Sequence, residues 1–190
     1  MLNLVLFGPP GAGKGTQSDF LIENFKLIHI STGDLLRNQI AAQTEMGIEA
    51  KSYMDKGFLV PDRIVIGMIK SLLQENVDAM GHIFDGFPRT VDQALALDVL
   101  LDELGTPISG MISLKVDKQE LINRLLTRGL TSGRPDDQDI SIIENRIHQY
   151  NEKTLPLINY YSAQNKYYEI DGMGTIEEIT QRLINTVSAL

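Results

Sequence analysis

Short runs of consecutive apolar residues recur along the chain, separated by segments in which apolar positions repeat with helical spacing. The apolar runs are Leu2–Phe7, Leu27–Ile30, Ile83–Phe84, Gly110–Val116 and Tyr167–Ile170. Continuous rather than alternating apolar residues are typical of strands that are buried on both faces. Strands that alternate with helices predict a parallel sheet with helices on both sides. We therefore expect an α/β fold.

The helical segments are expected where apolar residues return every three or four positions. The predicted helices are about Lys14 to Asn24, Ile64–Leu73, Gln119–Arg128 and one that begins near Ile140, and a more polar helical excursion is predicted over roughly residues 38–60. A short loop over Gly129–Pro135 is expected before the last of these helices. Ser31 or Thr32 can cap the helix that follows the second strand, because a hydroxyl satisfies a free amide of the first turn.

Composition and charge narrow the class of protein. The 190 residues are 43% hydrophobic, so the chain can bury one core as a single domain. A net charge of −8 argues against a nucleic-acid partner, which requires a basic surface. The absence of cysteine excludes disulfides and thiolate zinc sites. No signal peptide is recognisable and no apolar stretch approaches the roughly 20 residues of a membrane helix, so we expect a cytoplasmic protein without a membrane partner.

The first apolar run leads into GPPGAGKGT, residues 8–16, which contains the pattern G-x-x-x-x-G-K. Strand, glycine loop and helix start are the parts of a phosphate-binding P-loop, in which backbone N–H groups surround an anion and the lysine adds a point charge. Gly15 stands where the general pattern has Ser or Thr, and the hydroxyl follows at Thr16. The sequence thus predicts a nucleoside triphosphate site.

Charged residues further along the chain fit the same site. Asp85 ends a strand, where P-loop proteins commonly place an acid near magnesium. Six arginines fall at element ends or in loops, which favours a site for several phosphates; they are Arg37, Arg89, Arg124, Arg128, Arg134 and Arg146. The three histidines form no metal-binding pattern with one another or with acids, and we expect them to be structural or exposed.

Five segments together resemble the adenylate kinase family from end to end: GPPGAGKGT, ISTGDLLR, DGFPRTVDQ, RGLTSGRPDD and EIDGMG. The resemblance implies a three-layer P-loop fold with a five-stranded parallel sheet. It also implies one kinase domain over residues 1–190, with a mobile nucleoside-monophosphate-binding segment over residues 31–60 and a short lid loop over residues 127–137. Longer family members insert about thirty residues in the lid, sometimes with zinc on cysteines, so a short-lid form without zinc is implied here.

The resemblance also implies roles for individual residues. The ATP site would comprise Gly11, Ala12, Gly13, Lys14, Gly15, Thr16, Arg124, Arg128 and Gly174. The AMP site would comprise Thr32, Arg37, Phe58, Leu59, Val60, Gly86, Phe87, Pro88, Arg89, Gln93, Arg134 and Arg146. Lys14, Arg89, Arg128, Arg134 and Arg146 would be catalytic, and Thr16 and Asp85 would hold Mg²⁺ indirectly, through its shell. Strict counting from the family pattern lands on Asn145, but the helical face favours Arg146.

The implied reaction is MgATP + AMP ⇌ 2 ADP, so the expected partners are ATP, AMP and ADP, and a monomer is expected. Two alternatives remain. One is a kinase for UMP or CMP, against which Thr32 and Gln93 argue, because related pyrimidine kinases typically have Ala and Asn there. The other is a nucleotide-binding module without transferase activity. His82 also departs from the family, which usually has an apolar residue at that position.

Overall fold

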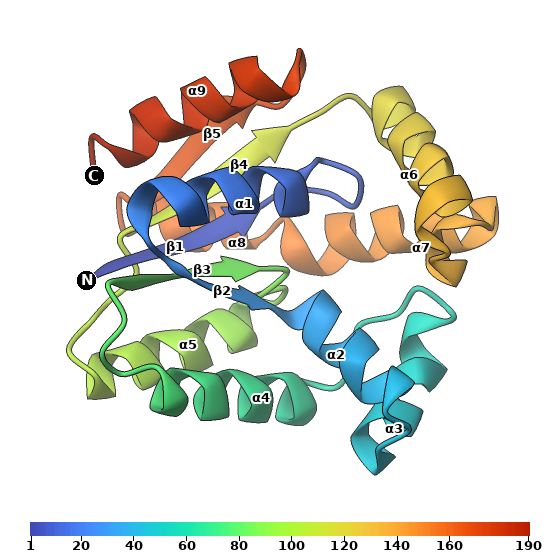
Figure 1. The fold of residues 1–190 in the computed structure, drawn as a ribbon, viewed down its shortest axis with the longest axis horizontal. Coiled ribbons are helices and arrows are strands. Elements are labelled where there is room, and N and C mark those ends of the chain that lie inside the picture. The colour runs from blue at the N-terminus through green and yellow to red at the C-terminus, as the bar shows by residue number, and fades with distance from the viewer.

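The computed structural model describes all 190 residues and contains one parallel sheet (Figure 1). Its strands are β1 (Leu2–Phe7), β2 (Ile28–Ser31), β3 (Gly81–Asp85), β4 (Gly110–Lys115) and β5 (Tyr167–Asp171). Their order across the sheet is β2-β3-β1-β4-β5, and every neighbouring pair is parallel. The predicted fold class, an α/β P-loop fold with five parallel strands, is confirmed.

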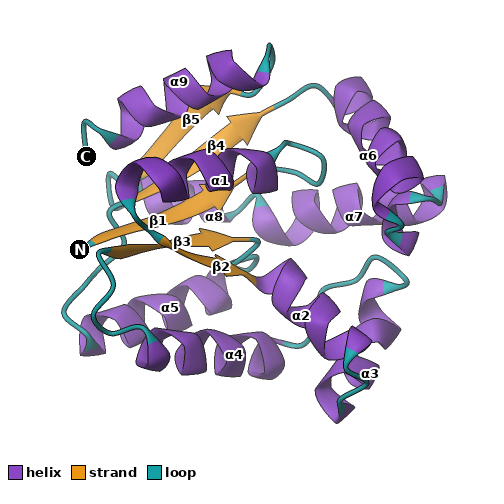
Figure 2. Cartoon of the chain, viewed as in Figure 1, coloured by secondary structure: helices purple, strands orange, loops and turns teal.

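Helices cover both faces of the sheet and produce three layers (Figure 2). On one face lie α1 (Lys14–Phe25) and α9 (Ile176–Val187), and on the other lie α4 (Asp62–Glu75), α5 (Val91–Glu103) and α8 (Leu157–Ser162). Successive strand residues point to opposite faces, so Leu4 packs in the core under α1 and α9, while Val5 packs in the core under α4, α5 and α8. This two-sided burial explains the continuous apolar runs.

Two groups of helices extend beyond the sheet at the carboxyl ends of its strands. The first is α2 (Thr32–Ala41) and α3 (Glu45–Met54), which correspond to the helical excursion predicted over roughly residues 38–60 but begin and end about six residues earlier. The second is α6 (Lys118–Ser132) with α7 (Ile140–Gln149), joined by a 3₁₀ turn over Pro135–Asp137 and followed by a π-helical turn over Tyr150–Thr154. A small separate apolar cluster, Leu125, Ile143 and Ile147, holds α6 against α7.

The predicted loop over Gly129–Pro135 is largely wrong, because α6 continues for four more residues and ends at Ser132. Gly129 is part of the helix, and its missing side chain lets the 3₁₀ turn approach: a Cβ there would lie 2.5 Å from the Asp137 carbonyl oxygen. The helix stops at Gly133, which takes a left-handed conformation with φ 65°. Most of the expected lid loop is therefore helical.

The register of the strands brings Asp85, the end of β1 and the end of β2 together at the carboxyl ends of the strands. Asp85 lies beside Leu6 of β1 and beside Ser31 of β2, so the ends of three strands meet at the loop after β1. Ligands of open α/β sheets bind at such carboxyl edges. None of the helices is both long and apolar enough to cross a lipid bilayer.

Candidate functional site

The P-loop connects β1 to α1 and wraps around the Lys14 ammonium. Gly11 and Gly13 have φ of 85° and 92°, in the left-handed region that glycine enters without strain. Lys14 Nζ donates to the carbonyl oxygens of Gly8 and Pro9, at 2.7 and 3.1 Å. The strand, the loop and the helix that starts at Lys14 have the arrangement that the sequence predicts.

The surroundings of Lys14 disfavour the charged form of its amine. Burial lowers its pKa to about 8, opposed by the Asp85 carboxylate and reinforced by the nearby guanidinium groups of Arg89, Arg146 and Arg128. A polyanion placed in the loop would relieve that repulsion. The charges around Lys14 therefore favour a phosphate group over a neutral ligand.

An open cleft of ≈ 710 Å³ extends from the P-loop to α6, and only one of its 22 lining residues is hydrophobic. All six arginines that the sequence singles out line it: Arg37, Arg89, Arg124, Arg128, Arg134 and Arg146. Residues 11–16, Asp85 and Gly86 also face this space. Six of the chain's eight arginines thus surround one cavity in a protein whose net charge is −8.

A buried acid that the sequence reasoning missed organises two of these arginines. The fully buried Asp137 carboxylate accepts from Arg128 Nε at 2.6 Å and Nη2 at 3.0 Å, and it also accepts from Arg146 Nη1 at 2.5 Å. Burial alone would raise the pKa of Asp137, but these ion pairs hold it below its usual range. The doublet Asp136-Asp137 could have suggested such a counter-charge, since Asp136 also pairs with Arg146 at 2.8 Å.

Arg89 is held from several sides. Its Nε donates to the Gly86 carbonyl at 2.7 Å, its backbone N–H donates to Gln93 Oε1 at 2.7 Å, and its carbonyl accepts from the Thr154 hydroxyl at 2.9 Å. Desolvation, together with the nearby charge of Arg146, lowers the pKa of Arg89 to about 10. The guanidinium group is thus fixed in direction while remaining charged at neutral pH.

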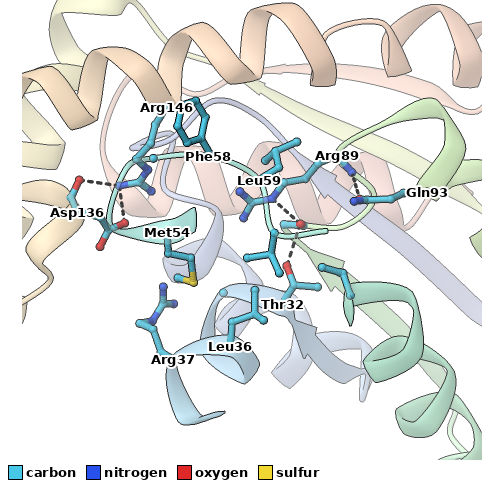
Figure 3. A pocket seen from close by; sticks show the side chains of 15 residues that line it. Thr32, Leu36, Arg37, Met54, Phe58, Leu59, Arg89, Gln93, Asp136 and Arg146 are labelled. Carbon is cyan, nitrogen blue, oxygen red and sulfur yellow. Dashed lines mark hydrogen bonds and ion pairs between the residues drawn. The ribbon is translucent and has the colours of Figure 1, made fainter. Parts of the chain in front are cut away.

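A smaller cavity of ≈ 70 Å³ opens beside Arg89 and has apolar walls with polar ends (Figure 3). Its apolar lining is Leu36, Met54, Phe58, Leu59, Val60 and Val65, and its polar lining includes Thr32, Arg37, Gln93 and Arg146. Thr32 is buried and donates to the Gly86 carbonyl at 2.9 Å. A flat apolar group that carries hydrogen-bonding atoms on its edge and an anion at one end would suit this shape.

The side chains at the end of β3 suit a hard cation. Burial would raise the pKa of Asp85, but His29 and Lys14 keep it below the usual value, so the carboxylate is ionised. Thr16 lines the same cleft. Hydroxyl and carboxylate oxygens together with phosphate oxygens form the donor set that Mg²⁺ prefers, and the two residues therefore fit an ion that arrives with a polyphosphate.

His29 has one acidic neighbour, Asp85, that the sequence does not reveal. Its Nε2 lies 3.8 Å from Asp85 Oδ2, and this nearby carboxylate raises the pKa of His29. The contact arises because β2 and β3 are adjacent parallel strands, although about fifty residues separate them in the chain. No local motif records that pairing. His82 is buried, with Nδ1 3.0 Å from Asn3 Oδ1, as a structural residue.

Three of the predicted site residues lie outside these two cavities. Phe87 and Pro88 line a neighbouring cavity of ≈ 90 Å³ behind the P-loop, which Lys14 and Arg89 also border. Gly174 lines none of the three, but its segment is adjacent to the cleft, because Arg124 Nη2 donates to the Gly172 carbonyl at 3.3 Å. Between the two candidates on α7, Arg146 faces the cleft, whereas Asn145 donates to the Lys56 carbonyl at 2.5 Å.

Comparisons with known proteins agree with this geometry. The family model described as adenylate kinase matches residues 6–166. The adenylate kinase of Flavobacterium johnsoniae is 50% identical over 190 residues, which cover 100% of both chains. The adenylate kinase of Parabacteroides distasonis is 50% identical over 188 residues, covering 99% of this chain and 98% of the relative. That of Leptospira biflexa is 49% identical over 187 residues, covering 98% of this chain and 100% of the relative.

Proposed function

The chain belongs to the adenylate kinase family and is a phosphotransferase, and on that premise we propose that it transfers the terminal phosphoryl group of MgATP to AMP, giving two ADP. One observation carries the proposal for this particular chain. A P-loop lysine and six arginines line a single cleft, and that cleft opens into an apolar-walled pocket with Thr32 and Gln93 at its polar end. A donor site and an acceptor site thus meet at Arg89.

The donor triphosphate would lie over the P-loop, where residues 11–16 offer backbone N–H groups and the start of α1. Lys14 would contact the phosphates, and Arg128 would hold them from the opposite wall. Arg124, whose guanidinium already bonds the Gly172 carbonyl, would stack on the donor base, with the Gly174 backbone nearby. Thr16 and Asp85 would hold the shell of the Mg²⁺ that accompanies ATP, and the ion would supply neutralisation of phosphate charge.

The acceptor would lie in the pocket between α2 and the start of α4. Thr32, Phe58, Leu59 and Val60 would surround the base, with Gln93 reading its edge. Arg37, Arg89 and the segment Gly86–Pro88 would hold the phosphate end, and Arg134 and Arg146 would reach it from the other side of the cleft. The lining of the smaller cavity supports these roles, because Arg37 and Arg146 line it together with Thr32 and Gln93 (Figure 3).

The chemistry needs little beyond position and charge. An oxygen of the AMP phosphate attacks the γ-phosphorus of ATP, and the bond to the β–γ bridging oxygen breaks, which leaves ADP on each side. The attacking oxygen is already anionic, so no strong general base is required. Lys14, Arg89, Arg128, Arg134 and Arg146 would stabilise the charge on the transferred group, which is the dominant contribution in such reactions.

Two segments would close over the substrates to exclude water. They are residues 31–60, which comprise α2 and α3, and residues 127–137 at the tip of α6. Their facing sides already approach each other, since Arg134 Nη2 lies 3.7 Å from Asp34 Oδ1. We further propose that the protein acts as a cytoplasmic monomer without zinc, in keeping with the absence of cysteine.

An acceptor panel tests the proposal directly. Purified protein with MgATP is offered AMP, UMP, CMP or GMP, and ADP release is followed by a coupled assay. We expect kcat/KM for AMP to exceed that for each other acceptor by at least about 100-fold, because buried hydrogen-bonding groups reject bases that leave them unpaired. Faster turnover with UMP or CMP would contradict AMP as the acceptor, and no turnover with any acceptor would favour a non-catalytic nucleotide-binding module.

A further inference from the structure

The side chain of Gln93 is nearly fully buried, 2% exposed, and both ends of its amide are engaged. Oε1 accepts from the backbone N–H of Arg89 at 2.7 Å. Nε2 donates to Asp62 Oδ1 at 2.7 Å. A primary amide has two N–H donors and two lone pairs on its oxygen, so one donor and one acceptor remain for a ligand in the pocket that Gln93 lines.

These two partners fix which way round the amide lies. A backbone N–H can only donate, and an ionised carboxylate can only accept. Rotating the amide by 180° would place Nε2 against the Arg89 N–H and Oε1 against the Asp62 carboxylate, and both hydrogen bonds would be replaced by repulsion. In a buried site an unmade hydrogen bond is costly, so the amide has one orientation.

Asp62 and Gln93 both belong to rigid parts of the fold. Asp62 is the first residue of α4, directly after Pro61. Gln93 lies in the first turn of α5, which Thr90 caps by accepting from the Gln93 N–H. Both helices pack into the same hydrophobic core, through Ile64 and Val65 of α4 and Ala94 and Leu97 of α5. The orientation is therefore set before any closure of the α2–α3 segment.

We propose that Asp62 is a specificity-determining positioning residue, which holds the Gln93 amide so that its free donor and acceptor match adenine and mismatch 6-oxopurines. Adenine presents an acceptor at N1 and a donor at its 6-amino group. Hypoxanthine and guanine present the reverse pattern, a donor at N1 and an acceptor at O6. Only a flipped amide would pair with that pattern, and Asp62 opposes the flip. The inference rests on the proposed AMP site.

The test compares AMP with inosine monophosphate, which differs from AMP at this edge of the base. Asp62→Ala should lower the ratio of kcat/KM for AMP to that for inosine monophosphate on the order of tenfold, the discrimination of about one buried hydrogen bond. KM for ATP should stay unchanged. Asp62→Asn should restore most of the ratio, because its amide oxygen can still accept from Gln93 Nε2. In a Gln93→Ala background, Asp62→Ala should have no further effect on the ratio.

Asp92→Ala is the matched control, because it also removes an acid from the first turn of a helix and its exposed side chain makes no hydrogen bond or ion pair. Asp92→Ala should leave the ratio of kcat/KM for AMP to that for inosine monophosphate within about twofold of the wild-type value. If Gln93→Ala lowers the ratio and Asp62→Ala does not, the positioning role of Asp62 is overturned while the AMP site stands. If the wild-type protein does not prefer AMP to inosine monophosphate, the proposed acceptor itself is overturned.

Discussion

Among single residues, the cations of the cleft are disfavoured first by burial and then by their repulsion of one another. Burial and neighbouring guanidinium groups lower the pKa of Lys14 to about 8, and Arg146 contributes to the lowered pKa of Arg89. Asp85 and Asp137 partly compensate this positive charge, Asp85 near Lys14 and Asp137 in ion pairs with Arg128 and Arg146. The remaining positive charge is available to phosphates, so binding and protonation must be linked.

ATP binding is predicted to take up a proton at Lys14 in alkaline solution. The free amine is partly neutral near and above pH 8, and the anionic phosphates raise its pKa again. With a pKa of about 8 in the protein without nucleotide, uptake should be small near pH 7 and should approach one proton near pH 9. Titration calorimetry with MgATP, in two buffers of different ionisation enthalpy, measures this number at each pH.

Lys14→Arg provides the control for that linkage, because a guanidinium group stays charged throughout the range. Its binding heat should not depend on the buffer. Identical heats for the wild-type protein in both buffers at pH 8.5 would mean that Lys14 is fully protonated in the free cleft, contrary to this electrostatic account.

At the scale of elements, the corner between α6 and α7 depends on one buried acid. The apolar contact between these helices is small, and the 3₁₀ turn places Asp137 between Arg128 and Arg146. Removing one partner of a buried ion pair leaves the others without compensation, which costs more than a surface pair would. Asp137 thus links the stability of the corner to the direction of two arginines in the cleft.

Asp137→Asn should lower the free energy of unfolding at pH 7 by about 2 kcal/mol. This is less than the loss expected for a fully buried ion pair, because both arginines are partly exposed to solvent. The folded pKa of Asp137 lies below its unfolded value, so its contribution is present above about pH 4 and is lost as the pH falls further. Urea titrations at pH 7 and pH 3.5 should therefore show a difference between variant and wild type that shrinks in acid.

Asp78→Asn, a change at an exposed acid without a charged partner, should leave stability within about 0.5 kcal/mol at both pH values. If Asp137→Asn is as stable as the wild type at pH 7, the corner does not depend on the ion pairs of Asp137.

The strands and most helices could be predicted from sequence because each follows from a local pattern. The P-loop could be predicted for the same reason, since its strand, loop and helix are continuous in the chain. The extension of α6 beyond Arg128 could not be predicted, because it depends on the 3₁₀ turn packing against Gly129. The contacts of Asp62 with Gln93 and of His29 with Asp85 join elements that are far apart in the chain, and local spacing does not indicate them. For Asp137 and Arg146 the acidic doublet was the one available signal.

At the scale of the whole molecule, an acidic protein concentrates positive charge at one edge of its sheet. The residues that do this come from the P-loop, α2, the end of β3, α6 and α7, and therefore from most of the chain's length (Figure 1). The two helical groups that extend beyond the sheet carry arginines toward each other across the cleft. Such an arrangement suits two phosphorylated ligands better than one, which is the central claim of the proposed function.

Phosphorus NMR of the complete reaction tests that claim most directly. With wild-type protein, MgATP and AMP should disappear together while two ADP form for each AMP consumed, without inorganic phosphate, and ADP alone should return the same mixture. Arg89→Ala should slow both directions on the order of 10³-fold, as for other cationic groups in phosphoryl transfer, whereas Arg63→Ala, at an exposed arginine outside the cleft, should not. Release of inorganic phosphate from ATP with AMP left unchanged would contradict the account.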